Sequence, residues 1–237
     1  MVVYTVDLLD KYIGQKVKDP YNRFIGTLAS IYSDVDGSVN AVEILFGDTE
    51  FRTVEAEKLA IHNGEIVLLP EWKYLALKVI DRLERARRRA KALEDLYAKG
   101  EIPKHAYEEF KGKVKRDLDY LKEEAKKTKE VIKQRIHELE DQIVQIEKAL
   151  TALKMSYIAG EISERGYKTA ASALRQGRDR NLEEKNEAKR VMETIQRLET
   201  SDIDLDYRFE AQKTHTEEAE ETQLFVEVLQ GSAESNA

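Results

Sequence analysis

The chain concentrates basic charge in one short stretch, RLERARRRAKAL, at residues 82–93. Five guanidinium groups and one ammonium group lie within ten positions, and Glu84 is the one acidic residue of the stretch, so local pairing cannot neutralise them. Such groups bind the phosphates of nucleic acids or of anionic lipid head groups. The candidate phosphate-binding residues, called the arginine-rich segment below, are Arg82, Arg85, Arg87, Arg88, Arg89 and Lys91.

Two interpretations of the arginine-rich segment stay open. It either contacts an anionic surface, membrane or DNA, or it is a solvated helix face neutralised by acidic residues of the same or another chain. No aromatic residues are interleaved with it and no base-reading motif accompanies it. Recognition of a specific DNA sequence is therefore not expected.

A second candidate site is the apolar peptide TQLFVEVLQ near the end of the chain, in which residues 222–229 are the candidate binding segment. In an extended strand, Leu224, Val226 and Val228 share one face, and Phe225 and Leu229 share the other. A lone apolar peptide in acidic surroundings cannot form a core of its own. It can add a strand to the sheet edge of a partner, which is the interpretation we favour over docking on the chain's own helices or sheet.

A separate segment, IDLDYRF at residues 203–209, alternates apolar and polar residues in the same way. This period of two is typical of a strand. Neither composition nor motif assigns it a role.

Catalytic and metal-binding patterns are absent from the sequence. There is no cysteine, the four histidines at positions 62, 105, 137 and 215 are far apart, and no HExxH, P-loop or GxSxG motif occurs. We therefore expect no enzyme, no cofactor, no metal and no small-molecule substrate. The N-terminus lacks the features of a signal peptide, and no apolar stretch reaches the roughly 18 residues of a spanning helix, so a cytoplasmic protein is expected.

Charge divides the 237 residues into three parts. Formal net charge is −6 over residues 1–72, +7 over 73–200 and −8 over 201–237. Residues 1–70 show short β-prone runs separated by turn sequences such as DVDG and HNGE, which predicts a small all-β barrel. From Trp72 onward apolar residues recur every three or four positions, which predicts helices over 72–98, 104–158 and 163–199.

The phrases LYAKGEIPKHAY (96–107) and SYIAGEISERGY (156–167) repeat each other sixty residues apart. In both, a glycine suits the left-handed end of a helix, and an isoleucine and two tyrosines can hold the reversal. The sequence thus predicts an α+β protein: a β domain over 1–70, an antiparallel three-helix coiled-coil rod over 71–199 that self-associates as a dimer or filament, and a largely disordered acidic tail over 200–237.

Two resemblances add to this interpretation. IGQKVKDPYNRFIGTLASIYSD, VNAVEILF and GEIVLLP resemble a PRC-barrel domain, which implies a barrel used mainly for docking. The order of barrel, helical rod and acidic tail with a terminal β-prone peptide resembles the CdvA family of archaeal cell-division proteins. That resemblance implies a non-enzymatic, membrane-associated filament at the division site on the inner membrane face. It also implies that residues 222–229 recruit the ESCRT-III-like protein CdvB by strand addition. The alternative is a structural protein that coats DNA through the rod and the arginine-rich segment.

Overall fold

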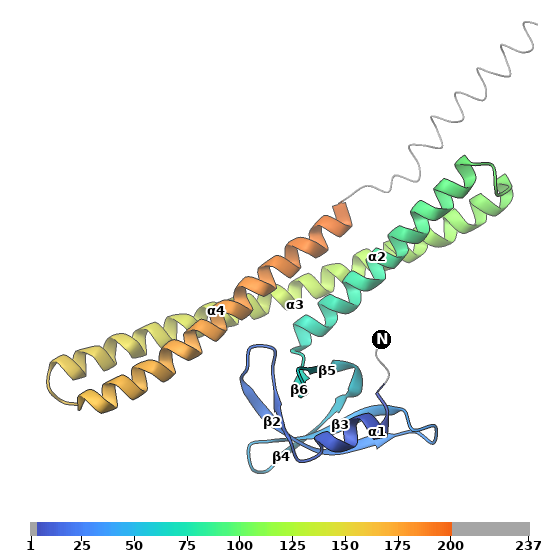
Figure 1. Ribbon diagram of the computed structural model, residues 1–237. Helices are drawn as coiled ribbons and strands as arrows, with labels where there is room; N and C mark the ends of the chain where they lie inside the picture. The colour runs from blue at the N-terminus through green and yellow to red at the C-terminus, as the bar shows by residue number, and fades with distance from the viewer. Residues whose placement is uncertain (1–3, 201–237) are drawn as a thin grey trace, which may run out of the picture. The chain divides into compact units, whose positions relative to one another are not determined.

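A computed structural model describes residues 4–200 of the chain (Figure 1). A β-rich domain comes first and three long helices, α2, α3 and α4, follow it. This composition confirms the predicted α+β class. The acidic tail and the candidate peptide at residues 222–229 lie outside the described residues.

The β domain is one six-stranded sheet in the order β4-β3-β2-β1-β6-β5. Neighbouring strands are antiparallel except β1 and β6, which are parallel. The strands are β1 (Lys16–Lys18), β2 (Phe24–Ser33), β3 (Val39–Phe46), β4 (Glu50–Glu55), β5 (Leu59–His62) and β6 (Glu65–Leu68). Helix α1 (Val6–Leu9) and the 3-10 helices η1 (Asp10–Tyr12) and η2 (Ala56–Lys58) complete the domain.

The core of this domain forms because its strands carry apolar side chains on one face. In β3, Val42 and Ile44 are fully buried and alternate with the more exposed Ala41, Glu43 and Leu45. Gly26 lets β2 approach β3 closely, because a Cβ at this position would lie 2.9 Å from the Ile44 Cγ2 atom. The core also includes Tyr4, Leu9, Tyr12, Val17, Leu28, Val39, Ala56, Leu59 and Ile66.

The sheet is not closed, which corrects the predicted barrel. In the described residues β4 and β5 form opposite edges of the sheet and do not pair with each other. The one-turn helix η2, whose Ala56 is buried, connects these two strands along the chain. The succession of short strands was visible in the sequence, whereas the strand order is a property of the folded sheet.

The three long helices are α2 (Glu71–Ala98), α3 (Lys104–Ile158) and α4 (Glu164–Thr200). Each contains an apolar stripe with the helical period, and the stripe of α3 includes the buried Ile132, Ile136, Leu139 and Ile143. None of the helices in the described part of the chain is long and apolar enough to cross a membrane.

The repeated phrase builds two similar helix ends. Gly100 and Gly160 have φ of +71° and +76°, the left-handed conformation that favours glycine. The amide of the residue after each glycine donates to the carbonyl five residues earlier, at 3.0 Å and 2.9 Å, as in a Schellman motif. Across each turn the two tyrosine rings stack, with centroids 4.2 Å apart for Tyr97 and Tyr107. The predicted reversal is confirmed, and stacking is how the tyrosines hold it.

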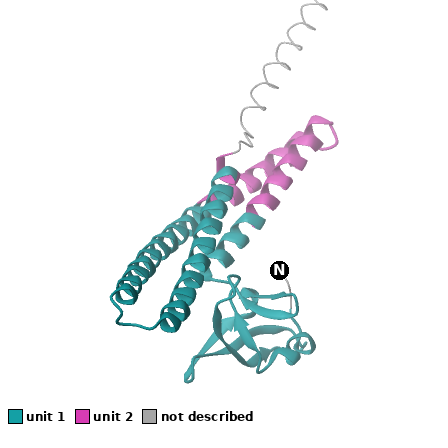
Figure 2. Ribbon diagram, turned by 60° about the vertical axis from the view of Figure 1, so that its left-hand side comes forward, with its two compact units in different colours: residues 1–81, 123–197 teal, residues 82–122, 198–237 magenta. Residues whose placement is uncertain are grey.

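The chain divides into two compact units, and the division falls inside the long helices (Figure 2). Unit 1 comprises residues 1–81 and 123–197, hence the sheet with parts of all three helices. Unit 2 comprises residues 82–122 and 198–237, and in its described part the end of α2 packs beside the start of α3. Each unit is considered by itself below.

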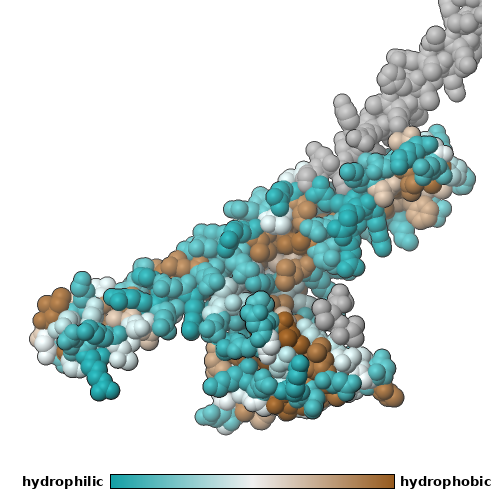
Figure 3. Space-filling view, in the orientation of Figure 1, coloured by the Kyte–Doolittle hydropathy of each residue, from teal (hydrophilic) through white to brown (hydrophobic). Residues whose placement is uncertain are grey.

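Unit 1 exposes apolar side chains along about the last four turns of α3, before the α3–α4 turn. Val144, Met155 and Ile158 are 46%, 67% and 74% exposed. Met155 lies about three turns beyond Val144, and Ile158 lies three residues beyond Met155, so the three share one broad face of the helix. Figure 3 shows hydrophobic surface at this turn, at the left end of the view, beside largely hydrophilic helix surface.

Candidate functional site

The arginine-rich segment lies on α2 in unit 2, and the helix distributes its side chains over more than one face. Arg82, Arg85 and Arg89 follow one another at three- and four-residue spacing. They line a cleft of about 350 Å³ together with Asp117 and Tyr120 of α3. Three guanidinium groups on one helix face suit an anionic surface that carries several phosphates.

The other members of the segment face elsewhere. Arg88 forms an ion pair with Glu84, one turn earlier, at 3.6 Å. Arg87 donates from Nη1 to the backbone carbonyl of Leu198, near the end of α4, at 3.2 Å. Lys91 is exposed. The six predicted residues therefore do not form a single patch, and Arg82, Arg85 and Arg89 are the subset that shares a cleft.

The predicted partner-binding residues, Leu224, Phe225, Val226, Val228 and Leu229, lie outside the described residues. The structure describes α4, the helix that precedes these residues in the chain. Helix α4 ends at Thr200, and positions 201–237 follow it in the sequence.

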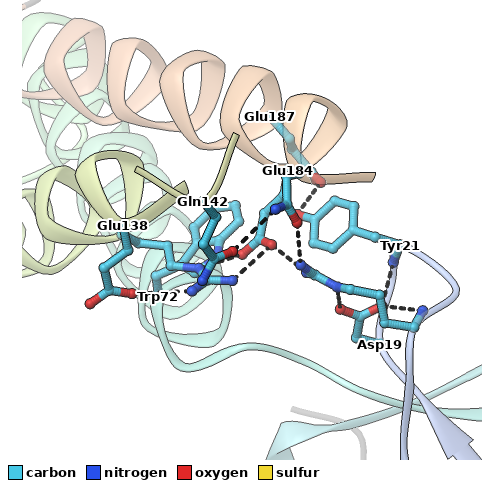
Figure 4. Close-up of polar contacts among 10 residues, drawn as sticks. Asp19, Tyr21, Trp72, Glu138, Gln142, Glu184 and Glu187 are labelled. Atoms are coloured by element: carbon cyan, nitrogen blue, oxygen red, sulfur yellow. Dashed lines mark hydrogen bonds and ion pairs between the residues drawn. The ribbon is translucent and has the colours of Figure 1, made fainter. Parts of the chain in front are cut away.

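Unit 1 contains a polar cluster that the sequence analysis did not identify (Figure 4). Its centre is Glu184 of α4, whose side chain is fully buried. The Trp72 indole donates to Glu184 at 2.9 Å, and Arg135 donates twice, at 2.8 Å and 3.0 Å. Arg23 also donates to this carboxylate. One carboxylate thereby joins α2, α3, α4 and the β1–β2 loop.

The β1–β2 loop, residues 19–23, is itself built to present Arg23. The carboxylate of Asp19, 5% exposed, accepts hydrogen bonds from the backbone N–H of Tyr21 at 2.9 Å and of Arg23 at 2.8 Å. It also accepts one from Arg23 Nε at 2.5 Å. Because Asn22 adopts φ of +60°, the turn is tight, and it directs Arg23 to the helices.

A second set of contacts lies beside the first. The Tyr21 hydroxyl donates to Glu187 of α4 at 2.7 Å, and Lys73 of α2 forms an ion pair with the same carboxylate at 2.6 Å. Arg23 also donates to Asn181, at 3.2 Å. We call these residues the Glu184 cluster: Asp19, Tyr21, Arg23, Trp72, Lys73, Arg135, Asn181, Glu184 and Glu187.

The electrostatics of the cluster favour an ionised Glu184. Burial alone would raise the pKa of this carboxyl, but hydrogen bonds from Arg135, Arg23 and Trp72 outweigh burial and lower the pKa below its ordinary value of 4.5. Burial raises the pKa of Tyr21, and its hydrogen bond to Glu187 raises it further. Tyr21 therefore stays a neutral donor at physiological pH.

The Glu184 cluster joins four segments of unit 1. A fully paired carboxylate between two arginines holds elements together, and in residues 4–200 no group of three or more acidic or histidine side chains is arranged to hold a metal ion. One signal in the sequence could have revealed the cluster. Glu184 lies four residues before Ala188, which is about one helical turn. A charged residue therefore stands at a position of the apolar stripe of α4.

Comparison with known proteins identifies the family of the helical part. The model of the CdvA-like coiled-coil domain matches residues 71–220, which is more than half of the chain. The chain belongs to the CdvA-like family. The match begins at Glu71, the first residue of α2, and extends past Thr200, the last residue of α4.

A curated relative of the chain is cell division protein A of Sulfolobus acidocaldarius. The two are 38% identical over 200 residues, which covers 84% of each chain. The aligned stretch is longer than the whole part of the chain that follows the β domain, so it also includes some of that domain. The likeness therefore extends beyond the helices. No solved structure matches the chain.

Proposed function

We propose that this chain is a non-enzymatic scaffold of cell division, and that it assembles into filaments at the membrane. The observation that carries the proposal is the identity of 38% to cell division protein A over 84% of both chains. The three long helices, and the buried Glu184 cluster that ties helices to sheet, suit a mechanical role.

In this proposal, residues 222–229 recruit an ESCRT-III-like protein, CdvB, by adding a strand to its sheet. The family resemblance and the alternation of Leu224, Val226 and Val228 support this step. The main-chain hydrogen bonds of an added strand provide affinity, and alternate side chains provide specificity. The described fold ends at Thr200, so positions 201–221 separate the peptide from α4 and give it reach.

The experiment that tests recruitment uses the full chain and the ESCRT-III-like protein of the same cell. Titration calorimetry compares the wild type with a variant that carries Leu224→Asp, Val226→Asp and Val228→Asp. The control, Ser232→Asp, Ala233→Asp and Ser235→Asp, adds the same charge beyond the peptide. Loss of three buried apolar side chains should weaken binding at least about a hundredfold, with the control unchanged. Equal binding by all three proteins would reject the assignment.

Self-association in this proposal uses the exposed apolar face near the α3–α4 turn. Val144, Met155 and Ile158 offer apolar area that a second copy can cover. Sedimentation velocity should show that replacing all three by serine shifts the protein toward monomer. Replacement of the exposed Leu77 on α2 by serine removes one apolar side chain elsewhere in the unit and should leave assembly unchanged.

One observation favours a second candidate function, the coating of DNA. Arg82, Arg85 and Arg89 line one cleft of unit 2. If they meet DNA phosphates, changing all three to glutamine lowers the slope of log affinity against log salt by roughly 2–3. The matched control changes Arg175, Arg178 and Arg180 of α4 to glutamine and removes equal charge. The same variants, assayed by co-sedimentation with anionic vesicles, decide whether the segment serves the membrane instead.

A further inference from the structure

Unit 2 has an apolar groove where α2 approaches the turn into α3. Its volume is about 420 Å³, within the range of clefts that bury small apolar ligands. The apolar lining residues are Ala92, Leu93, Leu96, Ile102, Ala106, Phe110 and Val114. Leu96 and Phe110 are 38% and 52% exposed, so the groove leaves two large apolar side chains in contact with water.

We propose that the groove is the docking site of the chain's own residues 203–209, IDLDYRF. This goes beyond the proposed function and does not depend on it. Ile203, Leu205, Tyr207 and Phe209 supply apolar side chains at alternate positions, which fit a groove of this composition.

The end of α4 places this segment within reach of the groove. The Leu198 carbonyl accepts a hydrogen bond from Arg87, so the chain leaves α4 beside Arg87. Along α2, Leu93 and Leu96 lie six and nine residues beyond Arg87, or about 9–14 Å away. The seven residues from Leu198 to Leu205 span about 10 Å as helix and about 23 Å as strand. A helix therefore reaches the level of Leu93, and a strand reaches beyond Leu96.

Charge complements the apolar fit. Residues 201–210 contain four acidic side chains and one arginine, a net charge of −3. Arg89, Lys113 and Asp117 line the groove beside its apolar residues and give it a net charge of +1. Acidic residues between the apolar ones in the segment would therefore lie near basic residues of α2 and α3.

The extent of the family match supports the same assignment. It ends at residue 220, past residues 203–209 and before the terminal peptide at 222–229. Residues 203–209 thus fall inside the matched region, whereas the terminal peptide lies outside it. Positions 210–221 lie between the two segments and keep the terminal peptide separate from the docked one.

Disulfide trapping in the full chain tests the proposal, since the natural sequence contains no cysteine. Ala106→Cys in the groove is paired with Leu205→Cys in the segment. Oxidation should yield a cross-link within one chain, seen as a monomer of altered mobility on a denaturing gel. The control keeps this cysteine pair and adds Ile203→Ser, Tyr207→Ser and Phe209→Ser, which removes the apolar side chains without changing charge or chain length.

Docking predicts that the control lowers the initial cross-linking rate at least about tenfold. Phe110→Ser, at an exposed position where the helix tolerates serine, should lower the rate in the same way, with helicity checked by circular dichroism. An unchanged rate would mean that the tether alone brings the cysteines together, and would overturn the proposal.

Cross-links between two chains would assign the groove to a second copy. Faster trapping of Val226→Cys than of Leu205→Cys would assign it to the terminal peptide. Because no partner protein is added, failure here is separate from failure of recruitment.

Discussion

Substitution of Glu184 by glutamine should destabilise unit 1 by about 3 kcal/mol. Glutamine preserves the volume of the side chain but removes a charge that accepts four hydrogen bonds, from Trp72, Arg23 and twice from Arg135. Loss of one partner of a buried ion pair typically costs about 3–5 kcal/mol. The lower end applies because the side chains of Arg23 and Arg135 are 24% and 25% exposed to water. Arg23 also keeps Asp19, and Arg135 keeps Glu138.

Trp72 makes the measurement direct, because it is the single tryptophan of the chain and belongs to the Glu184 cluster. Equilibrium unfolding in urea, followed by Trp72 fluorescence with separate baselines for each protein, gives the free energy of unfolding. The control is Glu183→Gln, the same change at an adjacent exposed position. A difference below about 0.5 kcal/mol between Glu184→Gln and wild type would refute the structural role of the cluster.

Dependence on pH gives a second check on the same variant. The folded-state pKa of Glu184 lies below the ordinary value of 4.5, so its stabilisation is fully present above that value. It is lost as pH falls through the lower folded-state pKa, where the folded carboxylate takes up a proton. The difference in unfolding free energy between wild type and Glu184→Gln should therefore shrink below about pH 4.5. If the difference in unfolding free energy stayed constant down to the pH of acid unfolding, the charge of Glu184 would not be its source.

Three further predictions concern the backbone and the turns. Gly26→Ala should lower the free energy of unfolding by about 2 kcal/mol, because its Cβ would overlap the backbone of β3. Gly112→Ala, at an open position of α3, should instead raise the free energy of unfolding by about 0.5–1 kcal/mol. Gly160→Ala should cost about 1–2 kcal/mol at its φ of +76°, measured by thermal unfolding, and no change would mean that the turn adopts another conformation. A double-mutant cycle of Tyr157→Ala and Tyr167→Ala should give a coupling of about 1 kcal/mol, since the rings stack at 4.5 Å, and zero coupling would contradict the stacking.

Local patterns explain which parts of the fold could be predicted. Helix periodicity and glycine at the helix ends are properties of neighbouring residues, so the sequence predicted 104–158 for α3, and the structure has Lys104–Ile158. The short strands were also predictable, because their turns use Asn63 and Gly64 with positive φ. The open edges of the sheet were not, because β4 and β5 follow each other in the chain and local patterns do not say whether two such strands pair.

The candidate sites divide in the same way. The sequence by itself determined that basic charge is concentrated at residues 82–91, since composition needs no fold. Tertiary structure decided which of these residues share a cleft. Arg82, Arg85 and Arg89 line one cleft because they lie on one face of α2, whereas Arg87 contacts the end of α4. Tertiary structure alone also decided the role of Glu184. Its partners come from positions 23, 72 and 135, and a buried carboxylate is stable only when folding brings donors from such distant segments to one point.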